Sequence, residues 1–172
     1  CHPGGGKPVG RPYPAGGKRR GHQGIGSDGF PTVTRPVFCN ESGSTLRFLI
    51  PVFSLTAQKI RFTGAGRLMD RPQEVYRMLF DRQGLRFEQT PEGITVFGRL
   101  RPGGLTLPGD VSSQFISGLL FALPLLQGDS TLTITPPFES RSYVELTLAA
   151  LRDFGVQVDW ADETRMKLLI PG

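Results

Sequence analysis

Four short segments of the sequence carry residue types that could bind a small anionic ligand. They are ESGSTLR at 41–47, TGAGRLMDRP at 63–72, GDVSSQF at 109–115 and FESRSY at 138–143. Each lies at the expected start of a helix or on the link that leads into one. Backbone N–H groups at a helix start are unpaired and lie at the positive end of the helix dipole, where they bind phosphate or carboxylate groups. The chemistry that these segments predict is therefore anion binding.

The first two segments combine glycine with hydroxyl or guanidinium groups. Gly43 and Ser44 lie at the start of the first predicted helix, although plain N-capping by a serine explains the same residue types. Arg67 and Arg71 lie four residues apart on a glycine-rich link, and guanidinium groups bind carboxylate and phosphate with paired hydrogen bonds. The alternative for Arg71 is an ion pair with a neighbouring carboxylate at the surface.

The other two segments offer hydroxyl, amide and phenol groups. Ser112 and Ser113 lie at the start of a very apolar helix, and the hydroxyl of either could cap it. A cap does not require the amide of Gln114, which therefore favours ligand binding. Ser140 and Tyr143 repeat the pattern at the next helix start, where surface charges and a packed tyrosine are the alternative. Together the four segments predict one site for a small, anionic, polyhydroxylated ligand.

The length and charge distribution limit the classes of protein. A chain of 172 residues suits one domain with a buried core and leaves no room for a second of similar size. The net charge of +5 belongs to residues 1–38, which hold six of the 20 Lys and Arg residues and one of the 15 Asp and Glu residues. The remainder is formally neutral, so its composition does not predict nucleic-acid binding.

Cysteine and histidine are scarce, with two of each in the chain. This excludes a disulfide framework, and the spacing fits no metal site. No apolar run reaches the ~20 residues that span a bilayer, and the N-terminus lacks the pattern of a signal peptide. We expect a cytoplasmic protein that needs no metal and no membrane.

The first 38 residues differ in character from the rest. They contain ten Gly and six Pro and show no helical or strand period. Such a segment cannot bury enough apolar surface to offset the entropy of ordering. We expect residues 1–38 to be disordered or to derive from a misread stretch that is not native coding sequence, and the domain to run from 39 to 172.

From residue 39 the hydrophobic pattern indicates alternating helices and strands. The predicted helices are 41–57, 71–84, 112–126 and 141–155, and the predicted strands are 58–64, 85–89, 94–98, 104–109, 130–137, 156–160 and 166–170. We expect Pro51 to kink the first helix or to confine it to its first turns. In the second helix, Val75, Met78 and Leu79 are expected to share the apolar face.

The order of elements repeats within the chain. The two halves align at an offset of ~70 residues, with Arg71 on Arg141 and Gly84 near Gly155. A period of this length indicates a supersecondary unit that is used at least twice. The sequence therefore predicts a mixed α/β (α+β) domain of repeated units.

The four segments, in this order and spacing, resemble the 5-enolpyruvylshikimate-3-phosphate synthase family. The resemblance rests on ESGSTLRFL, TGAGRLMDRP, GDVSSQFISGLLFALPLL and FESRSYVELTLAALRDFG, and it extends from about Cys39 to Gly172. The sister family, the UDP-N-acetylglucosamine enolpyruvyl transferases, shares the fold but matches SSQF and ESRSY less well. The resemblance implies one domain of an inside-out α/β barrel built from βαβαββ units, with about two of three units in this chain.

The resemblance also implies a reaction of the shikimate pathway. It transfers the enolpyruvyl group of phosphoenolpyruvate to the 5-hydroxyl of shikimate 3-phosphate, without a cofactor, and the herbicide glyphosate competes. By motif position, the residues that would contact shikimate 3-phosphate are Ser112, Ser113, Gln114, Ser140 and Tyr143. Those that would face phosphoenolpyruvate are Gly43, Arg67 and Gln114, with Ser44, Arg47 and Arg71 in support.

Two features of the family are not found in the sequence. The opening Lys-Ser pair is absent upstream of Cys39, and the residues that move protons belong to a second, C-terminal domain. We therefore expect no catalytic residue and no turnover in this chain alone, and a complete enzyme that is a monomer. Two alternatives stay open: a nucleic-acid-binding module with a basic tail, and a structural domain without activity.

Overall fold

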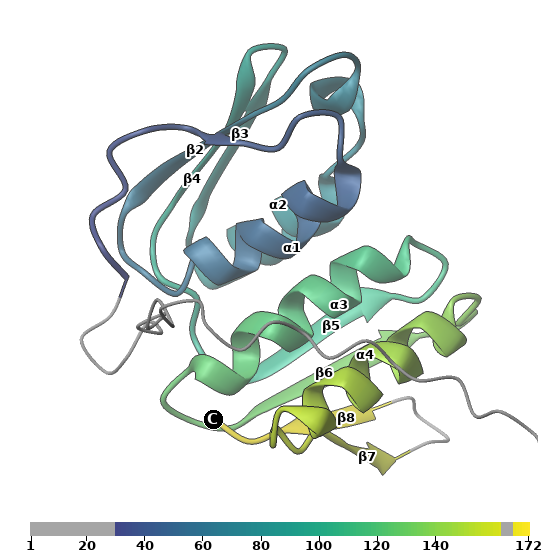
Figure 1. Ribbon diagram of the computed structural model, residues 1–172. Coiled ribbons are helices and arrows are strands. Elements are labelled where there is room, and N and C mark those ends of the chain that lie inside the picture. Colours follow the sequence, from purple (N-terminus) through teal and green to yellow (C-terminus); the bar gives the residue numbers. More distant parts are fainter. Residues whose placement is uncertain (1–29, 163–166) are drawn as a thin grey trace, which may run out of the picture.

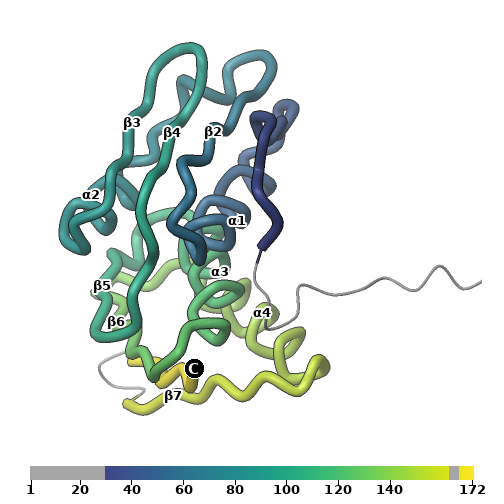
Figure 2. Tube along the Cα trace, turned by 90° about the vertical axis from the view of Figure 1, so that its left-hand side faces the viewer, coloured from purple at the N-terminus to yellow at the C-terminus, as the bar shows by residue number. Residues whose placement is uncertain are grey.

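The protein consists of two four-stranded sheets with helices packed between and beside them (Figure 1). The structure is a computed structural model that describes residues 30–162 and 167–172. Helices α1 and α3 lie side by side in the middle, as the views in Figures 1 and 2 both show. One continuous apolar core joins the two halves.

The first unit contains six main elements and one sheet. They are β1 (Val37–Phe38), α1 (Gly43–Phe53), β2 (Lys59–Thr63), α2 (Glu74–Gln83), β3 (Arg86–Thr90) and β4 (Gly93–Phe97), with a short 3₁₀ turn at Leu68–Asp70. The sheet order is β1-β2-β4-β3; β1 runs parallel to β2, and the other neighbours are antiparallel.

The second unit repeats the same path. Its elements are β5 (Gly104–Pro108), α3 (Ser113–Ala122), β6 (Ser130–Thr135), α4 (Arg141–Asp153), β7 (Asp159–Asp162) and β8 (Lys167–Ile170), with a 3₁₀ turn at Leu123–Leu125. The sheet order is β5-β6-β8-β7, with one parallel pair followed by antiparallel pairs. Both units therefore have the order βαβαββ, which confirms the predicted mixed α/β fold and the internal repeat.

Helix α1 continues through Pro51 to Phe53, so the expectation that Pro51 confines it to its first turns is wrong. Ser42 caps the helix by accepting a hydrogen bond from the Thr45 N–H at 3.1 Å. Pro51 has no N–H to offer the carbonyl of Arg47 four residues earlier. The hydroxyl of Tyr76 donates to that carbonyl at 2.6 Å and replaces the missing bond.

Helix α2 buries the expected Leu79 and packs Val75 against the core, but it leaves the expected Met78 exposed. Tyr76, Leu79 and Phe80 are buried, whereas Met78 is 45% exposed. The two aromatic rings decide the orientation because they bury the most area, and Phe80 packs edge-on against Phe87 of β3. The predicted end of the helix is confirmed: Gly84 has φ 71°, the left-handed conformation that closes many helices.

The folded part begins before the expected boundary at residue 39. Val37 pairs with Phe62 of β2, and the ring of Phe30 lies 5.9 Å from that of Phe53. The N–H of Val33 donates to the side chain of Gln58 at 2.8 Å. Residues 30–38 therefore belong to the domain, because a parallel strand and distant aromatic contacts order a stretch that has no pattern of its own. The remaining residues of the expected disordered segment, 1–29, lie outside the described residues.

The last hairpin starts later than predicted. The expected strand at 156–160 is β7 at Asp159–Asp162, because Val156 belongs to the end of α4: its N–H donates to the Leu151 carbonyl at 2.9 Å. Two residues of the expected turn, Glu163 and Thr164, lie outside the described residues. The first hairpin forms as predicted, with Thr90 paired to Gly93 across a two-residue loop.

Candidate functional site

Three helix starts surround one polar hollow of about 600 Å³. Helices α1, α3 and α4 all begin on the right-hand side of Figure 1. The residues that line the hollow are Ser44, Phe48, Ser112, Ser113, Gln114, Ser117, Ser140, Tyr143, Leu146 and Thr147. Six of the predicted site residues, from three segments, are thus brought together. No acidic residue lines this hollow in the part of the chain that the structure describes, which favours an anionic ligand.

The start of α3 carries three predicted residues on consecutive positions. Ser112 is the N-cap, and its hydroxyl accepts from the Gln114 N–H at 3.4 Å, so the capping alternative is correct for this residue. Its side chain also lines the hollow, as do those of Ser113 and Gln114. Capping and ligand binding are therefore compatible here.

A side chain on α1, that of Arg47, fixes the side chain of Gln114 on α3. The Nη1 of Arg47 donates to the Oε1 of Gln114 at 2.9 Å, and the Arg47 guanidinium lies 4.5 Å from the centre of the Phe115 ring. Burial lowers the pKa of Arg47, and the nearby charge of Arg71 acts in the same direction. A guanidinium group stays protonated in proteins, so Arg47 is a cation beside the hollow.

Ser140 and Tyr143, at the start of α4, have polar groups that a ligand could contact. Ser140 is the N-cap, but its hydroxyl makes no capping hydrogen bond to the helix. Tyr143 is 64% exposed and lines the hollow. Both groups can donate to or accept from a ligand, since hydroxyl and phenol groups do both.

The floor of the hollow contains residues that the sequence analysis missed. The hydroxyls of Ser117 on α3 and Thr147 on α4 are 2.7 Å apart and link the two helices. Phe48 and Leu146 add apolar surface. Helical spacing could have found all four. Ser117, Phe48 and Thr147 each lie four residues after a predicted site residue, and Leu146 lies three residues after Tyr143.

The glycine-rich link brings one of its two arginines to the start of α1. A Cβ atom built on Gly43 would lie 2.7 Å from the Nη1 of Arg71 and 3.9 Å from the Oε1 of Gln114. Gly43 therefore leaves the space that Arg71 occupies. Asp70 and Glu74, the expected partners of Arg71, pair with Arg67 and Arg77 instead.

Arg67 does not line the hollow. Its side chain is 91% exposed and its Nε lies 3.6 Å from the Asp70 carboxylate. The role expected for Arg67 opposite phosphoenolpyruvate therefore stays a prediction.

Comparison with known proteins decides the family. The family model described as EPSP synthase (3-phosphoshikimate 1-carboxyvinyltransferase) matches residues 20–172. The chain belongs to the EPSP synthase family.

Relatives in this family support the assignment over most of the chain. The 3-phosphoshikimate 1-carboxyvinyltransferase of Clostridium novyi is 41% identical over 149 residues, which cover 86% of this chain and 34% of the relative. That of Clostridium kluyveri is 50% identical over 131 residues, covering 74% and 30% respectively. The chain thus spans about a third of the length of these relatives.

A solved structure agrees on the fold. The EPSP synthase from Acinetobacter baumannii superimposes with a TM-score of 0.67 at 23% identity, covering 87% of this chain and 33% of that structure. This likeness supports the enolpyruvyl transferase fold that the sequence predicted.

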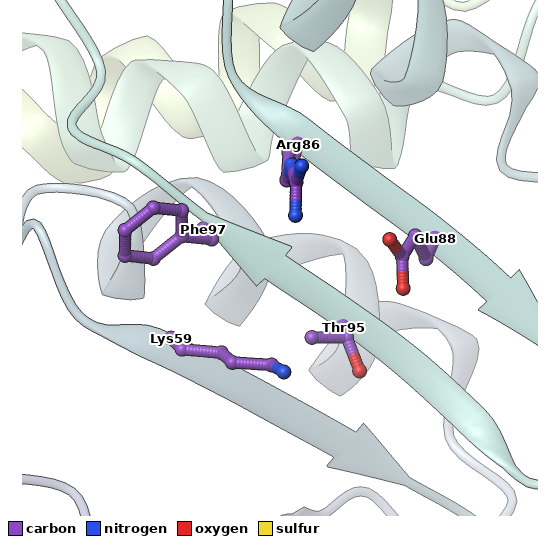
Figure 3. A pocket seen from close by; sticks show the side chains of 5 residues that line it. All are labelled: Lys59, Arg86, Glu88, Thr95 and Phe97. Atoms are coloured by element: carbon purple, nitrogen blue, oxygen red, sulfur yellow. The ribbon is translucent and has the colours of Figure 1, made fainter.

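A second depression, about 170 Å³ in volume, lies on the outer face of the first sheet (Figure 3). Lys59, Phe97 and Arg86 lie in register across β2, β4 and β3. An aromatic ring between two cations could stack a base, but single-strand binders use successive rings, and among the residues that the structure describes Phe97 is the only aromatic one lining this depression.

Two kinds of feature are absent from residues 30–162 and 167–172. These residues contain no helix long and apolar enough to cross a membrane. They also contain no group of three His, Cys, Asp or Glu side chains placed to hold a metal ion.

Proposed function

We propose that this chain forms most of the shikimate 3-phosphate-binding domain of an EPSP synthase. In this proposal residues 30–172 provide about two of the three units of the domain, and the rest of the enzyme, including a C-terminal domain, closes over the hollow. The complete enzyme transfers the enolpyruvyl group of phosphoenolpyruvate to the 5-hydroxyl of shikimate 3-phosphate. It acts as a cytoplasmic monomer without a cofactor.

One observation carries the proposal: the hollow joins three helix starts to hydroxyl, amide and phenol groups, with no carboxylate in its described lining. A phosphate dianion is stabilised by backbone N–H groups at the positive end of a helix. The hydroxyls of a ring triol pair with serine, glutamine and tyrosine side chains. Shikimate 3-phosphate contains both kinds of group in one small molecule.

The proposed roles follow the positions of the side chains. Shikimate 3-phosphate contacts Ser112, Ser113, Gln114, Ser140 and Tyr143, which all line the hollow. Phosphoenolpyruvate lies between Gly43, Arg67 and Gln114, with Ser44, Arg47 and Arg71 in support. Arg71 beside Gly43 supplies a cation for an anionic group of this second substrate, and Arg47 supports the site through its hydrogen bond to Gln114.

Chemistry at the bound substrates needs groups outside this chain. Addition of the 5-hydroxyl to C2 of phosphoenolpyruvate removes a proton from the hydroxyl oxygen and adds a proton to the methylene carbon. Loss of phosphate then removes a proton from the methyl group so formed and restores the double bond. Serine, glutamine and tyrosine side chains in the hollow are neutral at pH 7 and poorly suited to these steps. We therefore expect the chain alone to bind its substrate without turnover.

The test is an amide NMR titration of the 172-residue chain with shikimate 3-phosphate. We expect peaks of residues 112–114, 140 and 143 to move, and shikimate without the phosphate to cause smaller shifts at higher concentration. Ser130→Ala, at a buried position in β6 away from the hollow, is the control variant and should titrate like the wild type. Dispersed peaks that do not move at any concentration of the phosphate would contradict the proposed ligand.

A further inference from the structure

A contact between α1 and α3 is built around a missing hydrogen bond. Pro51 cannot donate to the carbonyl of Arg47, because proline has no N–H. The Tyr76 hydroxyl donates to this carbonyl at 2.6 Å, and it lies 3.1 Å from the Phe115 carbonyl on α3. Tyr76 is fully buried, so the bond is shielded from water. The three helices α1, α2 and α3 therefore meet at one hydroxyl group.

Gly118 provides the space for this junction. A Cβ atom at Gly118 would collide with the Arg47 carbonyl oxygen and with the Tyr76 hydroxyl. Only glycine lets the Arg47 carbonyl of α1 lie against the backbone of α3. Pro51, Tyr76 and Gly118 thus fix the position of Arg47 relative to α3.

At this position the Arg47 side chain determines the orientation of one amide in the site. Its guanidinium group rests on the Phe115 ring and donates to the Oε1 of Gln114. A guanidinium group only donates, so the oxygen of the Gln114 amide has to face Arg47 and the nitrogen has to face away from it. Gln114 also lines the hollow, where its Nε2 then offers donors.

We infer that Arg47 is a positioning residue that turns Gln114 into an obligate hydrogen-bond donor toward the hollow. The inference rests on the proposed function for the identity of the ligand and deepens it: the group opposite Gln114 is an acceptor oxygen of the substrate. A free glutamine amide can present either end, and half of its orientations would place oxygen against substrate oxygen. Arg47 removes those orientations before the substrate arrives.

The first test needs no ligand. The side-chain NH₂ signals of Gln114 are assigned in the full 172-residue chain by their loss in Gln114→Met. We expect a shifted, well-separated pair in the wild type that moves to the position of free glutamine in Arg47→Met. Arg86→Met, on the outer face of the first sheet, is the matched control and should leave the pair in place. An unchanged pair in Arg47→Met, with the backbone peaks still dispersed, would overturn the inference.

The second test is a double-mutant cycle on the affinity for shikimate 3-phosphate. Arg47→Met should weaken binding about tenfold in the wild type and less than twofold in the Gln114→Met background, because Arg47 acts through Gln114. Equal losses in both backgrounds would overturn the inference by showing that Arg47 acts on the ligand directly. If the wild type does not bind at all, the proposed function fails, whereas the amide signals still decide the orientation.

A further variant covers the case in which Arg47→Met does not fold. Gln114→Glu keeps an acceptor for Arg47 on either oxygen and loses both donors. We expect it to fold and to bind shikimate 3-phosphate at least tenfold more weakly. Wild-type affinity in Gln114→Glu would overturn the inference, because the hollow would then not need a donor at this position.

Discussion

The two units have the same path, yet they use one equivalent arginine differently. Arg71, before α2, lies against Gly43 at the start of α1 and makes neither of its expected ion pairs. Arg141, at the start of α4, lies 4.8 Å from the centre of the Trp160 ring and pairs with Glu145 at 3.3 Å. The first arginine is available to an anionic ligand, and the second is part of the packing of its own unit.

The residues that begin and end the helices are alike in the two units. Ser42 and Ser112 cap α1 and α3 with their hydroxyls, and Gly84 and Gly155 end α2 and α4 with φ 71° and 79°. The difference between the arginines is therefore not a difference in fold. It shows that a repeat can keep its capping residues while its side chains near a ligand diverge.

The largest expected effect breaks the contact between the units. Gly118→Ala places a methyl group on the Arg47 carbonyl and the Tyr76 hydroxyl, so α1 and α3 have to separate. We expect a loss of about 3 kcal/mol in the free energy of unfolding, as for overpacked cores, measured by urea denaturation. The equivalent position in α1 is Phe48, where Phe48→Leu should cost clearly less. A loss below about 1 kcal/mol for Gly118→Ala would mean that the helices separate easily.

Removal of the Tyr76 hydroxyl is expected to have the next largest effect. Tyr76→Phe leaves the Arg47 carbonyl buried without the donor that Pro51 cannot supply. The expected loss is about 2 kcal/mol in the free energy of unfolding. Phe80→Leu, one turn later on α2, tests loss of aromatic packing without loss of a hydrogen bond. Equal stability of Tyr76→Phe and wild type would show that another group satisfies the carbonyl.

The same hydroxyl gives the junction a dependence on pH. Burial raises the pKa of Tyr76 well above its usual value, and the charge of Arg47 opposes this only in part. The contribution of Tyr76 is complete below the pKa of an unfolded tyrosine, about 10, and is lost as the pH rises above it. We expect stability to fall above about pH 10 more steeply in wild type than in Tyr76→Phe. Parallel curves would contradict this origin.

The comparison of the two arginines predicts that the same substitution affects ligand affinity in one unit and stability in the other. Arg71→Met should weaken binding of shikimate 3-phosphate plus phosphoenolpyruvate about tenfold with little change in stability. Arg141→Met should lower the free energy of unfolding by about 1 kcal/mol, because it removes the contact with Trp160. Calorimetric titration and urea denaturation of both variants make the measurement. If both variants lose affinity to the same extent, the units do not differ in the way proposed.

The smallest effect tests the similarity of the units. Gly84→Ala and Gly155→Ala each force a side chain into the left-handed conformation, with no atom of the described residues closer than 4.0 Å to the new methyl group. Each should cost about 1 kcal/mol in the free energy of unfolding, and the two should be equal within error. A clear difference would show that the helix ends of the two units are not equivalent.

Features of the fold that depend on neighbouring residues were predictable from the sequence. Glycine ends both amphipathic helices, serine begins α1 and α3, and the strands predicted at 85–89 and 94–98 form as β3 and β4. The serines and glutamine of 112–114 form one local motif, so they were found together. The family assignment was possible for the same reason, because its motifs are short and ordered along the chain.

Features that depend on distant residues were missed. The continuation of α1 through Pro51 needs a hydroxyl from Tyr76, on another helix. Residues 30–38 are ordered by contacts with β2 and Phe53, so the disorder predicted from their composition alone was wrong. On α2, hydrophobic periodicity could not predict that Tyr76 is buried and Met78 is exposed, because this depends on the shape of the core that the helix meets.

The contact between α1 and α3 also has a consequence for the order of events at the ribosome. Phe48 on α1 packs edge-on against Phe121 on α3, with the ring centres 5.2 Å apart, and Gly118 of α3 lies against the Arg47 carbonyl. When the first unit has left the exit tunnel, α3 is still being synthesised, and this apolar face of α1 has no cover. A growing chain with such a face is prone to aggregate or to bind chaperones. The core of the first unit therefore stays incompletely packed until the second unit has emerged, even though both units have the same order of elements.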